Sequence, residues 1–270
     1  MNLGKTIRLK RLFSHPTGRF CSIAVDHLLG YGLDMPPGLL HIKPSLAAIM
    51  AANPDAVTMH KGIAASLWPR YAGQVPLIIQ GSGIKTDDSA LETFATPEDA
   101  IRLGADAFAV AAFIRGKTEG SMLRAVADSV RQASYYEIPV ICHIYPRVWD
   151  ADGNVSISYK PDDIAWAARC AVEVGADVVK TPYCGDVAAH RQIVEDCPVP
   201  MVAAGGPKTN TFEEALQQMW EVVEAGALGA TIGRNAWGFP NITANVEAFK
   251  AVIHDRMVPA QAMARVAQLA

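Results

Sequence analysis

The chain has 270 residues, of which 50% are apolar and 19% are charged, so it can bury the large core of one α/β domain. Its formal net charge of −3 and isoelectric point near 6.2 argue against a basic nucleic-acid-binding surface. No uninterrupted apolar run reaches the length of about 18 residues that a membrane-spanning helix needs, so no membrane partner is expected.

The N-terminus and the cysteines bear on the compartment. The first segment, MNLGKTIRLKRLFS, is charged and lacks the apolar stretch and small-residue cleavage site of a secretory signal. The five cysteines are odd in number and form no CxxC pair, which favours reduced thiols in a cytoplasmic protein. We expect residues 1–18 to form a helical lead-in to a single domain over residues 1–270.

Eight short runs rich in Val, Ile and Ala follow in chain order, and each is predicted to be a strand. They are nearly continuous in apolar residues rather than alternating, as in parallel strands covered on both faces. Their starts lie 20 to 38 residues apart, which leaves room for a helix and two loops between neighbours. The predicted strands are 19–26, 55–60, 75–80, 105–111, 138–144, 176–181, 199–204 and 228–233.

The segments that lead into these strands also repeat. LGADAFAV, VGADVVKT and AGALGATI each place Gly-Ala before a strand, where glycine suits the end of the preceding helix. QVPLII, EIPVIC and PVPMVA place proline at the strand entrance, where a missing N–H is tolerated. Eight βα units predict a TIM (β/α)8 barrel. The alternative is an open doubly wound sheet, but no single Gly-rich dinucleotide turn dominates the sequence.

The residues where the predicted strands end include many polar and titratable side chains, and this is where barrels of this kind carry their chemistry. In chain order these are Asp26 and His27, His60 and Lys61, Gly81 and Ser82, Phe113 and Arg115, His143 and Tyr145, Lys180, Gly205 and Gly206, and Gly233 and Arg234. Because the strands are parallel, these groups are expected to converge on one rim.

Lys180 ends the otherwise apolar run ADVVKT. A lysine among apolar neighbours loses solvation of its charged form, so its pKa should fall. That makes an amine able to attack a carbonyl and form a Schiff base. The alternative is a structural lysine that extends to the rim or pairs with Asp26.

Two further side chains on this rim could exchange protons with a substrate. Tyr145 offers a phenol beside the lysine, and Asp26 offers a carboxylate for a substrate hydroxyl or for a carbinolamine. Each has an ordinary structural explanation by itself, because tyrosines often pack in cores and aspartates often cap helices. Together on one rim they predict a proton relay.

The last two strands end in the glycine-rich segments AAGGPKT and TIGRNAW. Glycines there let backbone N–H groups approach an anion, and these two loops are the frequent phosphate site of the fold. Arg234 could add a fork of donors and Lys208 a further charge. Ordinary glycine-rich turns are the alternative.

Three histidines at strand ends raise the alternative of a metal site. His27, His60 and His143 could ligate a divalent ion that polarises a carbonyl. They come from three separate strands with no HxH or HxxxH spacing, so hydrogen bonding to substrate is the favoured interpretation, and no metal is predicted.

Several motifs together resemble a known family. VDHLLGYG, YPRV, ADVVKTPY, VAAGGPKT and TIGRNAWGFPN, spread from about residue 20 to residue 254, resemble the archaeal-type class I fructose-bisphosphate aldolases and the wider DeoC/FbaB aldolase group. The resemblance implies a homo-oligomer, commonly a decamer of two pentameric rings, and a reaction without metal or cofactor.

The resemblance also implies roles for individual residues. Lys180 matches the Schiff-base lysine, Tyr145 the general acid/base and Asp26 the active-site aspartate. The phosphate-binding residues are expected to be Gly205, Gly206, Lys208, Gly233 and Arg234. We expect His27, His143, Lys61 and Arg147 to bind substrate.

The sequence departs from the aldolase pattern at the end of the fifth predicted strand, shortly after that strand, and at the end of the third. His143 stands where the aldolases have a tryptophan that lines the sugar site, Val148 replaces a glycine, and IIQGSGIKTDD is unlike the usual third segment. The expected function is a class I aldolase acting on a phosphorylated ketose such as fructose 1,6-bisphosphate. Relatives suggest the alternatives of a thiolase acting on a phosphorylated pentanedione or an amino-dideoxy-heptulosonate synthase, and a silent sugar-phosphate-binding barrel is a third.

Overall fold

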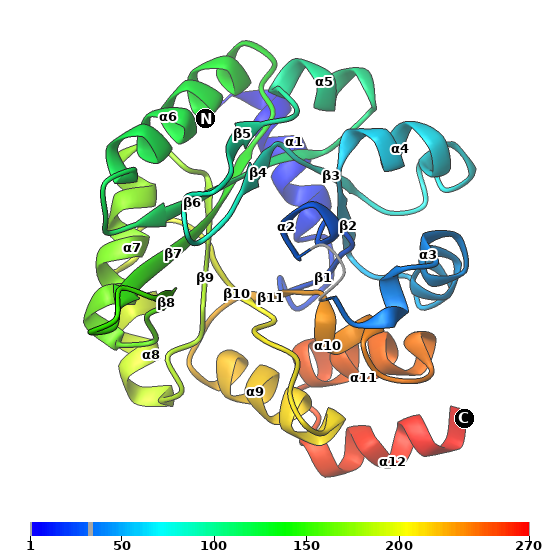
Figure 1. Cartoon of the computed structure of the whole chain (residues 1–270). Helices are drawn as coiled ribbons and strands as arrows, with labels where there is room; N and C mark the ends of the chain where they lie inside the picture. The colour runs from blue at the N-terminus through cyan, green and yellow to red at the C-terminus, as the bar shows by residue number, and fades with distance from the viewer. Residues whose placement is uncertain (1, 32–34, 270) are drawn as a thin grey trace.

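Eight parallel strands close into a barrel in the computed structural model, which describes residues 2–31 and 35–269 (Figure 1). Each strand pairs with the next around the ring, and β1 closes it by pairing with both β2 and β11. The barrel strands are β1 (Phe20–Ala24), β2 (Ala56–Met59), β3 (Leu77–Gln80), β6 (Ala107–Ile114), β7 (Val140–Trp149), β9 (Val178–Thr181), β10 (Met201–Ala204) and β11 (Gly229–Ile232). The predicted TIM barrel is confirmed, and each strand overlaps its predicted run, although β6 and β7 extend beyond the predicted ends at residues 111 and 144.

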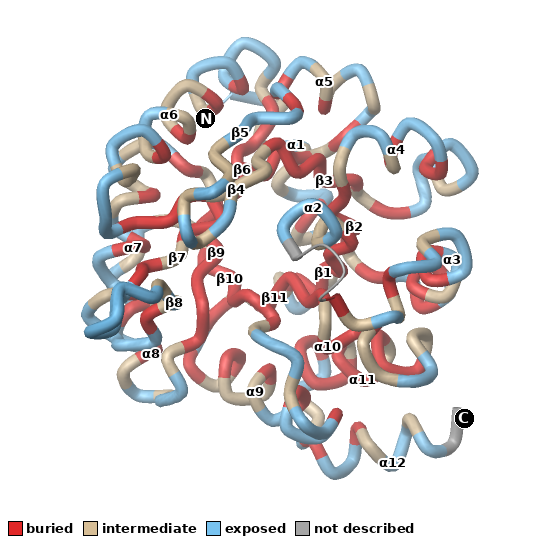
Figure 2. Tube along the Cα trace, viewed as in Figure 1, coloured by how far each residue is buried: buried red, intermediate tan, exposed pale blue. Residues whose placement is uncertain are grey.

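Most of the helices form a ring outside the strands, so the strand residues within the barrel are buried on both faces (Figures 1 and 2). This is why the strands read as continuous apolar runs. The helices are α1 (Leu3–Leu12), α2 (Leu28–Tyr31), α3 (Ile42–Ala51), α4 (Lys61–Leu67), α5 (Pro97–Arg102), α6 (Glu119–Tyr135), α7 (Pro161–Glu173), α8 (Val187–Asp196), α9 (Phe212–Glu224), α10 (Arg234–Trp237), α11 (Ile242–Asp255) and α12 (Pro259–Leu269), with 3-10 turns at Pro37–Leu39 and Trp68–Arg70.

Helix α1 closes the N-terminal end of the barrel. Its Leu12 is buried in a cluster with inward-facing strand residues such as Phe20 and Ile78, and Leu9 packs against the same cluster. Lys5 holds the helix in place by an ion pair of 2.9 Å with Asp177, which directly precedes β9. With this end filled by apolar side chains, the open end of the barrel is the one where the strands finish.

Three predicted helix ends take the backbone geometry that glycine favours. Gly104, Gly175 and Gly226 have φ values of +72°, +94° and +92°, and each follows a helix and leads into a strand. A side chain would be strained there, which explains the repeated Gly-Ala lead-in.

Two small additions above the barrel rim were absent from the sequence prediction. Strands β4 (Ser82–Ile84) and β5 (Leu91–Thr93) form an antiparallel hairpin after β3. Strand β7 continues past the barrel and pairs antiparallel with β8 (Val155–Ile157). Strands this short carry too few residues to show an apolar pattern. Over the described part of the chain, no helix has the length and apolarity needed to cross a bilayer.

Candidate active site

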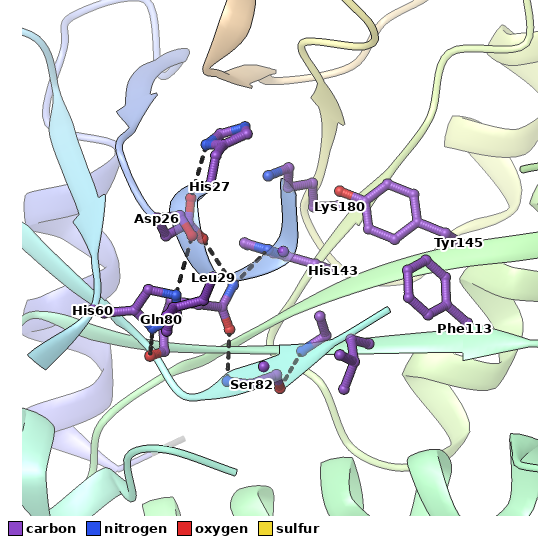
Figure 3. Close-up of a pocket in the computed structure, with 14 residues that line it drawn as sticks. Asp26, His27, Leu29, His60, Gln80, Ser82, Phe113, His143, Tyr145 and Lys180 are labelled. Carbon is purple, nitrogen blue, oxygen red and sulfur yellow. Dashed lines mark hydrogen bonds and ion pairs between the residues drawn. The ribbon is translucent and has the colours of Figure 1, made fainter. Parts of the chain in front are cut away.

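A cavity opens at the C-terminal ends of the strands (Figure 3). Lys180, near the end of β9, points into it together with His143 and Tyr145 from β7. The cavity is lined by Asp26, His27, Leu29, Gly30, His60, Gln80, Ser82, Gly83, Ile84, Ala111, Phe113, His143, Tyr145 and Lys180. The barrel thus brings residues from strands far apart in the sequence to one site.

Lys180 is only 6% exposed. Burial disfavours its charged form and lowers its pKa to about 8, although the nearby Asp26 carboxylate acts in the opposite direction. A substantial part of the population therefore carries a neutral amine near pH 8. This is the protonation state that a nucleophilic lysine requires.

Asp26 follows β1 and stays ionised in spite of its burial. Burial acts to raise the pKa of this carboxyl, but the hydrogen bond and charge of His27, followed by the charge of Lys180, hold it well below its usual range. Its Oδ1 lies 3.4 Å from His27 Nδ1, and its Oδ2 accepts a bond of 3.1 Å from Gln80 Nε2. A fixed carboxylate thus faces the lysine.

Gln80, the last residue of β3, connects Asp26 to His143. Its Nε2 lies 3.1 Å from Asp26 Oδ2 and 3.2 Å from His143 Nδ1, and its Oε1 accepts the backbone N–H of Ser82 at 3.0 Å (Figure 3). Gln80 was not among the predicted site residues. The available signal was an amide that ends an apolar strand, IIQ, at the barrel rim.

A second part of the cavity lies beside the first and is bounded by the loops after β10 and β11. Tyr145, Lys180, Phe113 and His27 line both parts, so the two parts meet at the lysine and the tyrosine. The second part is also lined by Thr86, Ile157, Tyr159, Pro182, Ala204, Gly205, Gly206, Pro207, Thr231, Gly233 and Arg234. We call the part with Asp26, Gln80 and His143 the carboxylate lobe and the part with Gly205, Gly206, Gly233 and Arg234 the glycine lobe.

The glycine lobe has no room for larger residues at its loops. A Cβ on Gly205 would lie 2.9 Å from the backbone of Ile232, and one on Gly233 would lie 2.2 Å from Cε1 of the His27 ring. Arg234 contributes its guanidinium, which donates to the Gly206 carbonyl at 3.1 Å. The arrangement places glycine backbone and the Arg234 guanidinium beside the space where an anionic ligand could bind.

Three predicted binding residues lie outside both lobes. Lys61 is the first residue of α4 and pairs with Asp99 at 3.1 Å. Lys208 stacks over the Phe239 ring, with 3.8 Å between Nζ and the centroid. The Arg147 guanidinium is fully buried against the β4–β5 connection and residues 115–118, so it supports the rim instead of facing the cavity.

The three strand-end histidines make separate contacts. Both ring nitrogens of His60 face backbone carbonyls, those of Gln80 and Asp26, while His27 faces Asp26 and His143 faces Gln80. Within residues 2–31 and 35–269, no group of three His, Cys, Asp or Glu side chains is placed to hold a metal ion. These contacts fit hydrogen-bonding roles better than a shared metal.

Comparison with known proteins identifies the family. The family model for DeoC/LacD family aldolases matches residues 20–238. The chain is 31% identical over 264 residues to 2-amino-3,7-dideoxy-D-threo-hept-6-ulosonate synthase of Halobacterium salinarum, covering 97% of this chain and 96% of that protein. It is 33% identical over 242 residues to class 1 fructose-bisphosphate aldolase of Thermoproteus tenax, covering 86% and 88%.

Solved structures agree with the sequence comparison. An archaeal fructose 1,6-bisphosphate aldolase superposes with a TM-score of 0.82 at 31% identity, covering 93% of this chain and 99% of that one. Another, at 30% identity with a TM-score of 0.81, has its catalytic lysine covalently bound to the carbinolamine intermediate and covers 92% and 99%. With its barrel, its buried lysine and these relatives, the chain is an enzyme that belongs to the DeoC/LacD family of aldolases.

Proposed function

We propose that this protein is a class I aldolase that makes or breaks a C–C bond in a phosphorylated ketose through a Schiff base on Lys180. The observation that carries the proposal is the position of the Lys180 amine, buried and with a lowered pKa, where the carboxylate lobe and the glycine lobe meet. A ketone held there can have its phosphate in one lobe and its remaining carbons in the other.

The reaction begins when the lone pair of the Lys180 amine attacks the ketone carbon. The carbonyl oxygen takes up one proton that the attacking nitrogen gives up and a second from an acid in the cavity, and it leaves as water, which yields an iminium ion. Cleavage removes a proton from the hydroxyl on the far carbon, releases an aldehyde and moves the bonding pair toward the nitrogen. Protonation of the enamine and hydrolysis regenerate the amine. We assign the proton transfers to Tyr145, while the Asp26 carboxylate assists carbinolamine formation and dehydration and positions substrate hydroxyls; both residues line the cavity beside the lysine.

The glycine lobe is the proposed phosphate site, and Arg234→Met tests this assignment. Loss of one charge-assisted contact is expected to raise KM for a phosphorylated ketose by about 10-fold or more, with a smaller change in kcat. Steady-state kinetics on the variant give both constants. An unchanged KM would place the phosphate elsewhere.

The rate of adduct formation should depend on pH through Lys180. Because burial lowers the pKa of Lys180 to about 8, the amine is protonated and inert below that value. The rate at which dihydroxyacetone phosphate is trapped should therefore rise about tenfold per pH unit up to pH 8 and then level off. Asp26 acts to raise this pKa, so Asp26→Asn should shift the rise to lower pH. A rise that continues to pH 10 would contradict the assignment.

The aldolase activity itself is tested by product analysis. Purified protein is incubated with fructose 1,6-bisphosphate and with other ketose phosphates, and triose release is measured with and without a chelator. Cleavage that persists with the chelator supports the proposal. Failure to cleave or to form any ketose phosphate would overturn it.

Transfer of the bound ketone fragment to another acceptor is the second candidate. The heptulosonate synthase of Halobacterium salinarum matches 97% of this chain. In addition, His143 and Gln80 line the carboxylate lobe with polar groups that could bind an acceptor. A transferase would release little free product until an acceptor aldehyde is added. Comparing product formation with and without acceptor aldehydes, and with and without coenzyme A, separates the candidates.

We further propose that the chain acts as one barrel domain in a cytoplasmic homo-oligomer, a pentamer or decamer, as the family resemblance suggests. Large apolar side chains on the outer surface support association, among them Trp166 at 50% exposure and Tyr135 at 79%. Sedimentation analysis of the purified protein measures the assembly, and a monomer at all concentrations would contradict this proposal.

A further inference from the structure

The hydrogen bonds around Gln80 determine which way its amide points. The backbone N–H of Ser82 can only donate, so the atom that it meets at 3.0 Å must be the Gln80 carbonyl oxygen, Oε1. The Gln80 NH2 group therefore faces the other way, toward Asp26 and His143. Ser82 is itself held in place, because its hydroxyl accepts the Ala111 N–H at 2.8 Å.

The amide in turn determines the tautomer of His143. The Gln80 NH2 group has two hydrogens, and its nitrogen lies 3.1 Å from Asp26 Oδ2 and 3.2 Å from His143 Nδ1. An amide nitrogen donates and does not accept, so His143 Nδ1 must be the unprotonated, accepting nitrogen. The ring proton then resides on Nε2.

The ring is also kept neutral. His143 is 4% exposed, and burial, with the positive charge of Lys180 adding to it, places its pKa well below the usual value. Asp26 acts in the opposite direction and His27 in the same direction as Lys180. A neutral imidazole with a fixed Nε2–H donates a hydrogen bond near neutral pH without taking up a second proton.

The position of His143 indicates which part of a substrate it meets. His143 lines the carboxylate lobe, whereas Lys180 and Tyr145 line both lobes. In the barrel register His143 is paired with Lys180 on the neighbouring strand. With phosphate in the glycine lobe and the imine on Lys180, the carbons beyond the imine lie on the His143 side.

We propose that His143 is a specificity-determining donor whose Nε2–H binds the oxygen of the aldehyde half of the substrate, and that Gln80 is the positioning residue that fixes this tautomer. The inference rests on the proposed function. In condensation, the donor polarises the acceptor's carbonyl oxygen while the enamine carbon forms the new bond. The proton that this oxygen finally acquires comes from Tyr145, and His143 keeps its own.

Two substitutions at His143 test the donor. His143→Phe fills the space without a donor, and His143→Gln restores an amide N–H near the former Nε2. Two readouts are measured on each protein: borohydride trapping of dihydroxyacetone phosphate on Lys180, which needs no aldehyde, and condensation with glyceraldehyde 3-phosphate. His143→Phe is expected to slow condensation about 10²-fold while trapping changes less than about threefold, and His143→Gln to recover part of the loss.

The outcomes separate this inference from the proposed function. No adduct in the unsubstituted protein would overturn the proposed function itself. A normal adduct in the unsubstituted protein, with trapping and condensation lost equally in His143→Phe, would overturn only the donor inference. Condensation unchanged in His143→Phe would do the same.

Nitrogen-15 spectra of protein labelled at histidine test the positioning role directly. The His143 resonances, identified by their loss in His143→Phe, should show a protonated Nε2 and an unprotonated Nδ1 without change between pH 6 and 9. Gln80→Met removes the amide and should mix the two tautomers while condensation slows more than trapping. A proton on Nδ1 in the unsubstituted protein would overturn the inference.

Discussion

Replacing Lys180 by methionine is expected to abolish turnover, with kcat reduced by at least about 10⁴-fold. Methionine keeps a long unbranched side chain but has no amine, so no iminium ion can form. Because Lys180 is 6% exposed, an apolar replacement fits its surroundings and the barrel should stay folded. Kinetics and thermal unfolding of the variant test both statements.

Lys250→Met is the matched control for this substitution. Lys250 is also partly buried, and its Nζ donates to the Ala52 carbonyl at 2.7 Å. Ala52 follows α3 and precedes β2, so this lysine lies toward the N-terminal end of the barrel, away from the cavity. Its loss should leave kcat within about twofold. Substantial turnover by Lys180→Met would contradict the Schiff-base mechanism.

Arg147→Met is expected to lower the free energy of unfolding by about 3 kcal/mol or more. The Arg147 side chain is fully buried and donates to the carbonyls of Thr86 and Arg115, to Thr118 Oγ1 and to the Asp88 carboxylate, 2.5 Å away. Methionine would leave these acceptors without their donor. Two of these bonds go to the Arg115 carbonyl and hold that residue at a φ of +67°, which is a costly backbone conformation. Their loss therefore adds to the destabilisation.

Arg115→Met serves as the comparison for Arg147. The Arg115 side chain is 49% exposed and pairs with Asp163 at 2.8 Å, so its loss should cost less than about 1 kcal/mol. Denaturant unfolding measures both variants. Proteolysis between β4 and β5 should be faster only in Arg147→Met, since that connection loses its bonds. Equal stability of the two variants would contradict a supporting role for Arg147.

Much of the fold could be predicted because its signal is repeated. Parallel strands buried on both faces give continuous apolar runs, and left-handed helix ends give the Gly-Ala lead-ins at Gly104, Gly175 and Gly226. Lys180 could be recognised for the same reason, since it is a charged residue within an apolar strand. The β4–β5 hairpin gave no comparable signal because its strands have three residues each.

The individual side chains were harder to assign. Arg147 shares the strand parity of His143 and Tyr145, so alternation alone predicts that it faces the same cavity. Strand β7, however, continues beyond the barrel, where Arg147 meets the β4–β5 connection. Lys61 follows a strand closely, but it is already the first residue of α4 and turns toward Asp99. The backbone path beyond each strand decides these cases, and it cannot be derived from spacing.

Gln80 illustrates what pairwise motifs miss. Its role comes from three bonds, to Ser82, Asp26 and His143, which lie at the ends of different strands or beyond a turn. The sequence around Gln80 does not predict its contacts with Asp26 and His143. Only the closed barrel, which brings β1, β3 and β7 around one cavity, gives this amide a defined orientation.

Borohydride trapping with dihydroxyacetone phosphate tests the central claim most directly. The protein is reduced in the presence of the ketone, its intact mass is measured, and the modified peptide is mapped, with Lys180→Met treated in parallel. The account predicts one reduced adduct per chain, on Lys180, and none in the variant. An adduct on a different lysine, or cleavage activity without any trapped adduct, would contradict it.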